Sequence, residues 1–236
     1  MAKNKHKRFA ENETFKHLFQ PSAQEMYEGD FHLKGKWNSD FFKNNNPITL
    51  EVGCGKGEYT TALAMQNPNK NYIGIDIKGP RLWTGSKIVQ EKGLKNVAFI
   101  RNKVEFLTSF FKKGEISEIW ITFPDPQRKK LKKRLTSARF LKIYSEILTN
   151  GGAINLKTDS VLMYEFTKRI IELNNLETIF STNDLYSLGL DNELTQIQTY
   201  YEKKFLEQNM KITYIKFLAG NKTDFENPEH ESKLSE

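Results

Sequence analysis

The chain has 236 residues, of which 38% are hydrophobic and 28% charged, and its formal net charge is +7. This composition is typical of one soluble α/β domain and excludes wholesale disorder, and no apolar run approaches the roughly 20 residues that a membrane-spanning helix needs. Cys54 is the only cysteine, which excludes an intramolecular disulfide and a multi-cysteine metal site and fits a reducing, cytoplasmic setting.

The first 45 residues have few periodic apolar positions and end in the loop-forming sequence NNNP. We interpret residues 1–45 as a basic, partly flexible N-terminal extension with a helix near Phe31–Phe42. We expect residues 46–220 to form the folded domain. The acidic residues 221–236 are predicted to be a flexible C-terminal tail.

Strands and helices alternate from residue 48 onward. Apolar runs predict strands at residues 48–53, 71–77, 96–102, 117–123 and 153–158. Amphipathic patterns predict helices at residues 58–68, 79–93, 104–111, 137–152 and 160–175. Such alternation implies right-handed crossovers and a mostly parallel sheet.

Two further strands, residues 176–185 and 211–218, close the pattern. We expect the polar connection between them to contain little helix. A parallel core that ends in such a strand pair suits the methyltransferase variant of the doubly wound fold, with a seven-stranded sheet flanked by helices.

A glycine-rich turn follows the first predicted strand. Gly53, Gly55 and Gly57 stand between strand and helix, where ligands bind in open α/β sheets. Because a tight turn needs glycine anyway, the turn alone leaves ligand binding and a purely structural role both open. The G-x-G-x-G spacing differs from the G-x-G-x-x-G of dinucleotide enzymes, which favours a cofactor without phosphates.

Polar residues near the ends of the first three strands suit such a cofactor. Asp76 closes the second strand, where a carboxylate can accept both hydroxyls of a ribose. Glu51 lies in an apolar strand, and a buried carboxylate is costly unless it meets a cationic partner. S-adenosylmethionine has a ribose, an ammonium and no phosphate, so we predict it as the cofactor. Asn102 is placed either to reach its adenine end or to cap the helix that follows.

The segment TFPDPQRKKLKKR, residues 122–134, joins an acidic turn to a basic block. Asp125 lies between two prolines, and six Lys or Arg fall within residues 128–134. One interpretation is an Asx-type turn followed by a solvated helix face. The other is a reactive carboxylate beside a surface that binds a polyanion, which the repulsion among neighbouring cations favours.

Several motifs occur in the order found in the bacterial tRNA (guanine-N7)-methyltransferases: LEVGCGKG, GIDIKG, RNKVEFL, FPDPQRKKLKKRL, NLKTD and TYYEKKF. The chain resembles this family over residues 47–217. The resemblance implies a Rossmann-like class I S-adenosylmethionine-dependent methyltransferase fold. It also implies an enzyme that methylates guanosine N7 at position 46, in the variable loop of tRNA.

The resemblance also assigns roles by motif, with Asp125 as the catalytic residue. Together with the glycine turn, it implies cofactor binding by Glu51, Gly53, Gly55, Gly57, Asp76, Asn102 and Asp125. It implies substrate binding by Lys129, Asp159, Thr199, Tyr200, Tyr201 and Glu202. It implies RNA contacts by Arg128, Leu131, Lys132, Lys133, Arg134, Leu135 and Thr136. The chain departs from the family at Gln127, where an aromatic is frequent, at Asn102, where aspartate is common, and at Tyr200 and Tyr201.

The chemistry of the implied reaction is simple. Guanine N7 carries an in-plane lone pair and no proton, so its attack on a sulfonium methyl needs no general base. We expect in-line transfer with the guanine held by Asp125. The expected partner is tRNA, without metal or membrane, and the protein is a monomer or homodimer.

Three other functions share parts of this pattern. A nicotinamide-dependent oxidoreductase would require G-x-G-x-x-G and leaves the basic block unexplained. A methyltransferase for a protein or small molecule would share the glycine turn but not the Asp-Pro and Lys/Arg segment. A non-catalytic RNA-binding protein would not need Glu51, Asp76 and Asp125.

Overall fold

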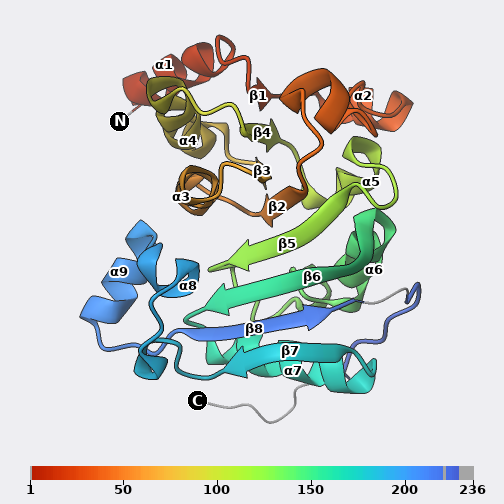
Figure 1. Ribbon diagram of the computed structural model, residues 1–236, viewed down its shortest axis with the longest axis vertical. Coiled ribbons are helices and arrows are strands. Elements are labelled where there is room, and N and C mark those ends of the chain that lie inside the picture. Colours follow the sequence, from red (N-terminus) through yellow and green to blue (C-terminus); the bar gives the residue numbers. More distant parts are fainter. Residues whose placement is uncertain (1, 220–221, 229–236) are drawn as a thin grey trace.

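One mixed sheet organises the fold in a computed structural model that describes residues 2–219 and 222–228 (Figure 1). Within these ranges, eight strands lie in the order β1-β4-β3-β2-β5-β6-β8-β7. Their bounds are β1 Leu18–Phe19, β2 Ile48–Val52, β3 Asn71–Asp76, β4 Val97–Arg101, β5 Ile116–Thr122, β6 Leu148–Thr158, β7 Glu177–Thr182 and β8 Thr213–Leu218. Strands β1 to β6 pair in parallel, whereas β8 runs antiparallel to both β6 and β7.

The mostly parallel sheet flanked by helices is confirmed, but the predicted number of seven strands was wrong. The predicted strands are β2 to β8, and the additional strand β1 lies in the predicted N-terminal extension. It pairs with β4 at Leu18 and Phe19, opposite Phe99 and Ile100. A two-residue strand is too short to show alternation in the sequence, which is why the pattern missed it.

Helices cover both faces of the sheet (Figure 1). The helices that follow β2 to β6 are α3 Glu58–Gln66, α4 Gly79–Lys92, α5 Leu107–Phe110, α6 Ala138–Ile147 and α7 Val161–Leu173. Strand side chains alternate between two cores, as a period of two requires. Leu50 and Val52 pack in the core that contains residues of α5, α6 and α7. Glu51, between them, instead meets Thr60 of α3 on the opposite face.

The N-terminal residues lie against this framework. Helix α1 (Ala2–Asn12) packs on α4, and the side-chain amide of Asn12 donates to the carbonyl of Gly79 at 2.8 Å. Helix α2 (Ala23–Glu28) and the π-helix η1 (Trp37–Phe42) follow. Trp37 is fully buried and donates its indole N–H to the carbonyl of Phe110. Most of the predicted C-terminal tail, 221–236, lies outside the described residues.

The connection between β7 and β8 contains helix, so the expectation of a helix-poor segment was wrong. Helices α8 (Glu193–Gln196) and α9 (Tyr200–Glu207) lie there. Helix α9 begins with a capping box, because the Thr199 hydroxyl accepts from the Glu202 N–H and the Glu202 carboxylate accepts from the Thr199 N–H. Figure 1 shows α8 and α9 beside the arrowheads of β5 and β6, so this connection reaches the carboxyl edge of the sheet.

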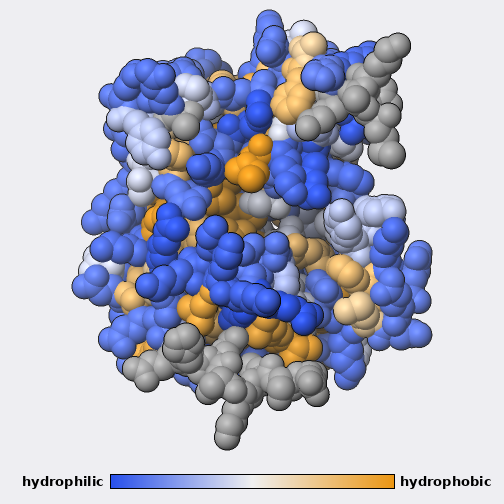
Figure 2. Space-filling model, turned by 180° about the vertical axis from the view of Figure 1, so that it is seen from behind, coloured by the Kyte–Doolittle hydropathy of each residue, from blue (hydrophilic) through white to orange (hydrophobic). Residues whose placement is uncertain are grey.

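One face of the molecule is largely polar (Figure 2). On the face turned away from the view of Figure 1, hydrophilic residues predominate and apolar side chains show in separate patches (Figure 2). In the part of the chain that the structure describes, no helix has both the length and the apolar composition to cross a bilayer.

Two glycines of the turn allow the cost of left-handed backbone strain to be separated from the cost of steric crowding when alanine replaces glycine. Gly55 and Gly57 have φ of +58° and +68°, but only a Cβ at Gly57 would meet another group, the Phe99 ring at 2.5 Å. We expect Gly57→Ala to lower the free energy of unfolding by about 3 kcal/mol, because overpacking adds to left-handed strain. Gly55→Ala, the control, should lose only about 1 kcal/mol from strain. Urea unfolding measures both, and equal losses would show that crowding is not the cause.

Candidate active site

The glycine turn lies where the order of the sheet reverses. Strand β2 is flanked by β3 on one side and β5 on the other, and ligands of open α/β sheets bind at this point. The N–H groups of Gly53 and Cys54 both donate to the carbonyl of Ile75, at 2.8 and 3.1 Å. The N–H of Gly55 donates to Asp76 Oδ2 at 3.0 Å. The turn is therefore fastened to the end of β3.

Two polar side chains were predicted to bind the nucleoside part of a cofactor. Asp76 Oδ1 accepts from the N–H of Lys78 at 2.7 Å, and the partly exposed carboxylate keeps acceptor capacity for a ribose. Asn102 is buried, and its amide donates to the carbonyl of Pro21 at 3.1 Å while its oxygen accepts from the N–H of Lys103. Lys103, not Asn102, is the cap residue of the following helix. Asn102 therefore ties the N-terminal segment to β4.

Glu51 is a buried carboxyl that neutral groups hold in place. One oxygen accepts from the N–H of Thr60 at 2.9 Å and from its hydroxyl, and the other accepts from the Thr122 hydroxyl at 2.5 Å. Burial raises the pKa of Glu51 to about 7, against the lowering effect of these hydrogen bonds. A cationic ligand group would complete the charge pairing of this carboxyl.

A cavity of about 90 Å³ opens above Glu51. Its lining includes the glycine turn, Phe123 after β5, and Thr199 and Tyr201 at the start of α9. Cavities for whole small-molecule ligands are typically about 300–1,000 Å³, so this space fits only part of a cofactor. Its position between Glu51 and the end of β5 suits the amino-acid end of the predicted cofactor, S-adenosylmethionine.

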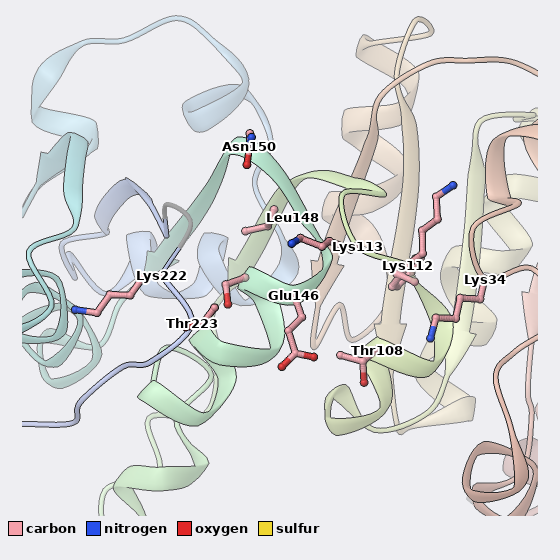
Figure 3. Close-up of a pocket in the computed structure, with 11 residues that line it drawn as sticks. Lys34, Thr108, Lys112, Lys113, Glu146, Leu148, Asn150, Lys222 and Thr223 are labelled. Atoms are coloured by element: carbon pink, nitrogen blue, oxygen red, sulfur yellow. The ribbon is translucent and has the colours of Figure 1, made fainter.

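A larger cavity of about 750 Å³ lies elsewhere (Figure 3). Lys112 and Lys113 lie a few residues before β5, and Leu148 begins β6, so this cavity adjoins the amino edge of the sheet. Figure 3 shows that the side chains of Lys34, Lys112 and Lys113 point in different directions instead of converging on one ligand position. We place the candidate site at the smaller cavity, which alone adjoins the glycine turn and Glu51.

Asp125 follows two residues that line the small cavity, Thr122 and Phe123. Its side chain is exposed, and its Oδ1 accepts from the N–H of Gln127 at 2.9 Å, which forms the Asx-type turn that was one interpretation of the sequence. Phe123 and Gln127 both adopt left-handed φ values, +47° and +46°. Such strain at residues other than glycine gathers at functional sites. The turn and a role for the carboxylate are compatible, since one hydrogen bond leaves acceptor capacity on Asp125.

The basic block divides into exposed and buried residues. Arg128, Lys129, Lys132 and Lys133 are exposed, whereas Leu131 and Leu135 are half-buried and pack against the core. The exposed cations therefore form a charged surface next to the Asp125 turn. The block contains a short 3₁₀ helix, Leu131–Lys133, and no long helical face.

Two of the residues that were predicted to contact RNA are buried. Arg134 is only 1% exposed, donates through Nε to the carbonyl of Pro126 at 3.0 Å, and stacks over Phe166. Thr136 is fully buried and shares a hydrogen bond with Thr167. Neither side chain reaches the surface. Arg134 instead fastens the second proline of the turn to the core.

The residues at the start of α9 that were predicted to bind substrate also differ in exposure. Tyr200 and Tyr201 are 45% and 47% exposed, and the Lys56 ammonium lies 4.5 Å from the centre of the Tyr200 ring. Glu202 is fully buried and forms an ion pair with Lys157 at 2.6 Å, and its contact with substrate stays a prediction. The pattern Thr-x-x-Glu is a capping-box signature, and this signal in the sequence identifies the structural role of Glu202.

Asp159 directly follows β6, at the same edge of the sheet. It is half-buried, and burial raises the pKa of its carboxyl. Among the described residues, no group of three or more His, Cys, Asp or Glu side chains could hold a metal ion.

Comparison with known proteins agrees with this geometry. A family model described as "Putative methyltransferase" matches residues 45–215. A solved structure entitled "Structure of an Antibiotic Related Methyltransferase" superposes with a TM-score of 0.59 at 21% identity, covering 79% of this chain and 94% of that one. The crystal structure of the 16S rRNA methyltransferase KamB gives 0.59 at 16% identity, covering 80% and 92%. Fold and site together define a Rossmann-like class I methyltransferase.

The sequence relatives narrow this class. The tRNA (guanine-N(7)-)-methyltransferase of Porphyromonas gingivalis (strain ATCC BAA-308 / W83) is 52% identical over 211 residues, which cover 88% of this chain and 86% of that protein. The enzyme of the same name from Bacteroides fragilis (strain YCH46) is 46% identical over 234 residues, or 99% and 93%. That from Bacillus subtilis (strain 168) is 37% identical over 174 residues, or 73% and 80%. The chain belongs to the tRNA (guanine-N(7)-)-methyltransferase family.

The raised pKa of Glu51 makes stability depend on pH. The ordinary carboxyl pKa of 4.5 applies to the unfolded chain, so between about 4.5 and 7 the folded state holds a proton that the unfolded state releases. Stability from this group is therefore complete below pH 4.5 and lost as the pH rises through 7. Relative to Glu51→Gln, which cannot ionise, we expect the wild-type free energy of unfolding to fall by about 3 kcal/mol between pH 5 and pH 8.

Denaturant unfolding of both proteins at the two pH values measures this difference. A difference between wild type and Glu51→Gln that stays constant with pH would contradict the raised pKa. The comparison cancels the titration of other groups, which both proteins share.

Proposed function

We propose that the protein transfers the methyl group of S-adenosylmethionine to N7 of a guanosine in tRNA, at position 46 of the variable loop. The observation that carries this proposal is the Asp125 turn, which continues directly from the cavity residues Thr122 and Phe123. The turn joins the edge of the sheet that holds the small cavity to an exposed basic surface. Membership of the tRNA (guanine-N(7)-)-methyltransferase family supports the substrate.

The residues at this edge fit the proposed cofactor. Glu51 is a buried carboxyl whose hydrogen bonds come from neutral groups, which suits the ammonium of the amino-acid part. Asp76 suits the ribose hydroxyls, and the backbone of Gly53 and Gly55 allows close approach of the ligand. When bound, S-adenosylmethionine supplies an electrophilic sulfonium methyl group.

Asp125 is proposed to hold the guanine. A carboxylate accepts from the guanine N1–H and exocyclic amino group, and this orients N7 toward the cavity. Because N7 has no proton, the protein needs no base at this position. The carboxylate also stabilises the positive charge that develops on the purine during transfer.

The exposed cations are proposed to hold the RNA backbone. Lys129, Lys132 and Lys133 follow the turn and are free of the core packing that holds Arg134. Contacts to phosphate position a nucleic acid without reading its sequence. Since enzymes that act on bases take the base out of its stack, backbone contacts beside Asp125 suit presentation of one nucleotide. Such a substrate favours a cytoplasmic location.

Incorporation of a labelled methyl group into unmodified tRNA transcript tests the proposed function. The product should be cleaved at 7-methylguanosine, at position 46. Label at another atom, in protein or in a small molecule would overturn the proposal. Binding of tRNA without any methyl transfer would favour the non-catalytic alternative.

Asp125→Ala isolates the role of the turn. We expect turnover to fall by about 100-fold or more, since the guanine loses its orientation. The dissociation constant for S-adenosylmethionine should remain measurable, because Glu51 and Asp76 lie on β2 and β3. Single-turnover methylation and calorimetric titration measure the two quantities. Asp40→Ala, in η1 before the amino end of β2, is the control, and near-normal turnover of Asp125→Ala would refute the role.

The basic surface predicts a dependence on salt. Removing one cation that binds a phosphate reduces the slope of log affinity against log salt by roughly one unit or less. Lys132→Gln with Lys133→Gln should therefore flatten the slope for tRNA binding. Lys112→Gln with Lys113→Gln, at the cavity of Figure 3, removes the same charge at the opposite edge and should leave the slope unchanged. Equal slopes for both double variants would exclude this surface as the RNA contact.

A further inference from the structure

Lys157 and Glu202 form an ion pair inside the protein, next to the candidate site. Both side chains are 0% exposed, and Lys157 Nζ lies 2.6 Å from Glu202 Oε1. Lys157 belongs to the carboxyl end of β6 and Glu202 to the first turn of α9. The pair therefore joins the sheet to the connection between β7 and β8.

Besides Glu202, the ammonium of Lys157 contacts two backbone carbonyls of this connection. It donates to the carbonyl of Leu194 at 2.5 Å and to the carbonyl of Ile197 at 3.2 Å. With Glu202, these contacts use three directions around one nitrogen, which matches the three N–H donors of an ammonium. The segment fixed in this way, residues 194–202, carries Thr199 and Tyr201 into the wall of the cavity.

Glu202 is held from several sides as well. Its Oε1 accepts from the Tyr186 hydroxyl at 2.8 Å, and its Oε2 accepts from the N–H of Thr199. Tyr186 precedes α8, so Glu202 links the part of the connection before α8 to the first turn of α9. The Glu202 carboxylate thus pairs with the Lys157 ammonium and also accepts hydrogen bonds from Tyr186 and Thr199 of the same connection.

The backbone of Lys157 also holds Phe123, another residue that lines the cavity. Its carbonyl accepts from the N–H of Phe123 at 2.8 Å. Phe123 has a left-handed φ of +47° and lies two residues before Asp125. One residue, Lys157, therefore contacts both the segment that carries Tyr201 and the turn that carries Asp125.

Stability alone is a poor reason to bury this pair. Burial lowers the pKa of Lys157 and raises the pKa of Glu202, because it penalises both charged forms, and each partner opposes the shift. Replacing a buried ion pair by apolar residues is often neutral or stabilising. Packing could close the core at this position, but it could not fix two carbonyl groups and a capping carboxylate in one geometry.

We propose that Lys157 is a positioning residue for methyl transfer. Its ammonium fixes residues 194–202, which carry Tyr201, and its carbonyl fixes Phe123 in the turn that carries Asp125. This inference rests on the proposed function for the reaction that is positioned. It also gives Glu202 an anchoring role, as the partner of this ammonium. Without the ammonium, the carbonyls of Leu194 and Ile197 would lose their donor, and residues 194–202 would move relative to the Asp125 turn.

The test uses a double variant, because Lys157→Met alone leaves a buried unpaired carboxylate and risks unfolding. Lys157→Met with Glu202→Gln removes both charges while Gln retains an acceptor for Tyr186. Lys216→Met with Glu118→Gln is the matched control, since Lys216 and Glu118 form an ion pair at 2.9 Å between β8 and β5. The full-length proteins are compared by far-UV circular dichroism, hydrogen exchange, binding of S-adenosylmethionine and methylation of tRNA transcript.

We expect the Lys157 double variant to remain folded and its kcat to fall by about 100-fold, because small displacements of positioned groups cost about that factor. Its dissociation constant for S-adenosylmethionine should change by less than about threefold, so the loss falls on kcat, which a general loss of folded protein does not produce. Amides within residues 194–202 should exchange faster, and the control should match wild type in all four measurements.

Three results would overturn the proposal: wild-type turnover in the Lys157 double variant, unchanged exchange in residues 194–202, or global unfolding of that variant. Global unfolding would show that the pair stabilises the fold as a whole. If the wild-type protein itself methylates no tRNA, the proposed function fails. Hydrogen exchange still decides the anchoring by Lys157 in that case, so the two failures are distinguishable.

Discussion

Burial of charge at the carboxyl edge of the sheet is the constraint on which the site depends. Glu51 on β2 and Lys157 on β6 lie on either side of β5, and both are buried. A buried charged or polar group must collect hydrogen bonds from whatever surrounds it. Glu51 therefore draws together α3 and β5 through Thr60 and Thr122. Lys157 draws together the Phe123 backbone and the segment before α9. The cavity is the space left between these two sets of bonds.

The N-terminal segment packs against the carboxyl edge of the sheet next to β4. Asn102 donates to the carbonyl of Pro21, and Arg101 stacks over Phe9 of α1 at 4.8 Å. Asp76, the proposed ribose ligand, pairs with Arg101 in the sheet register. Residues near the beginning of the chain thus flank the nucleoside end of the proposed cofactor site. Changes there can alter cofactor binding without touching the glycine turn.

Periodicity explains which features the sequence could predict. Strands β2 to β8 and the residues at their ends, Glu51 and Asp76 among them, follow from alternating patterns that local sequence carries. The two-residue strand β1 has no pattern to find. Burial of Arg134 was unpredictable because a run of cations has no period, and its contacts with Phe166 and with the carbonyl of Pro126 leave no trace in the local sequence. The capping role of Glu202 was readable from its spacing to Thr199. Its ion pair with Lys157 was not, because the two residues lie far apart in the chain.

Phe123 and Gln127, on either side of Asp125, hold a conformation that glycine or asparagine adopts with less strain. Selection for thermal robustness therefore favours replacing them, while selection for catalysis favours the rigid turn that larger side chains maintain. Phe123 packs against Phe205 of α9, at 5.9 Å between ring centres, so relaxing that position would also separate the two walls of the cavity. With the proposed role of Asp125, a stability–activity trade-off is expected in this turn, and engineering of this chain for stability should leave these two positions untouched.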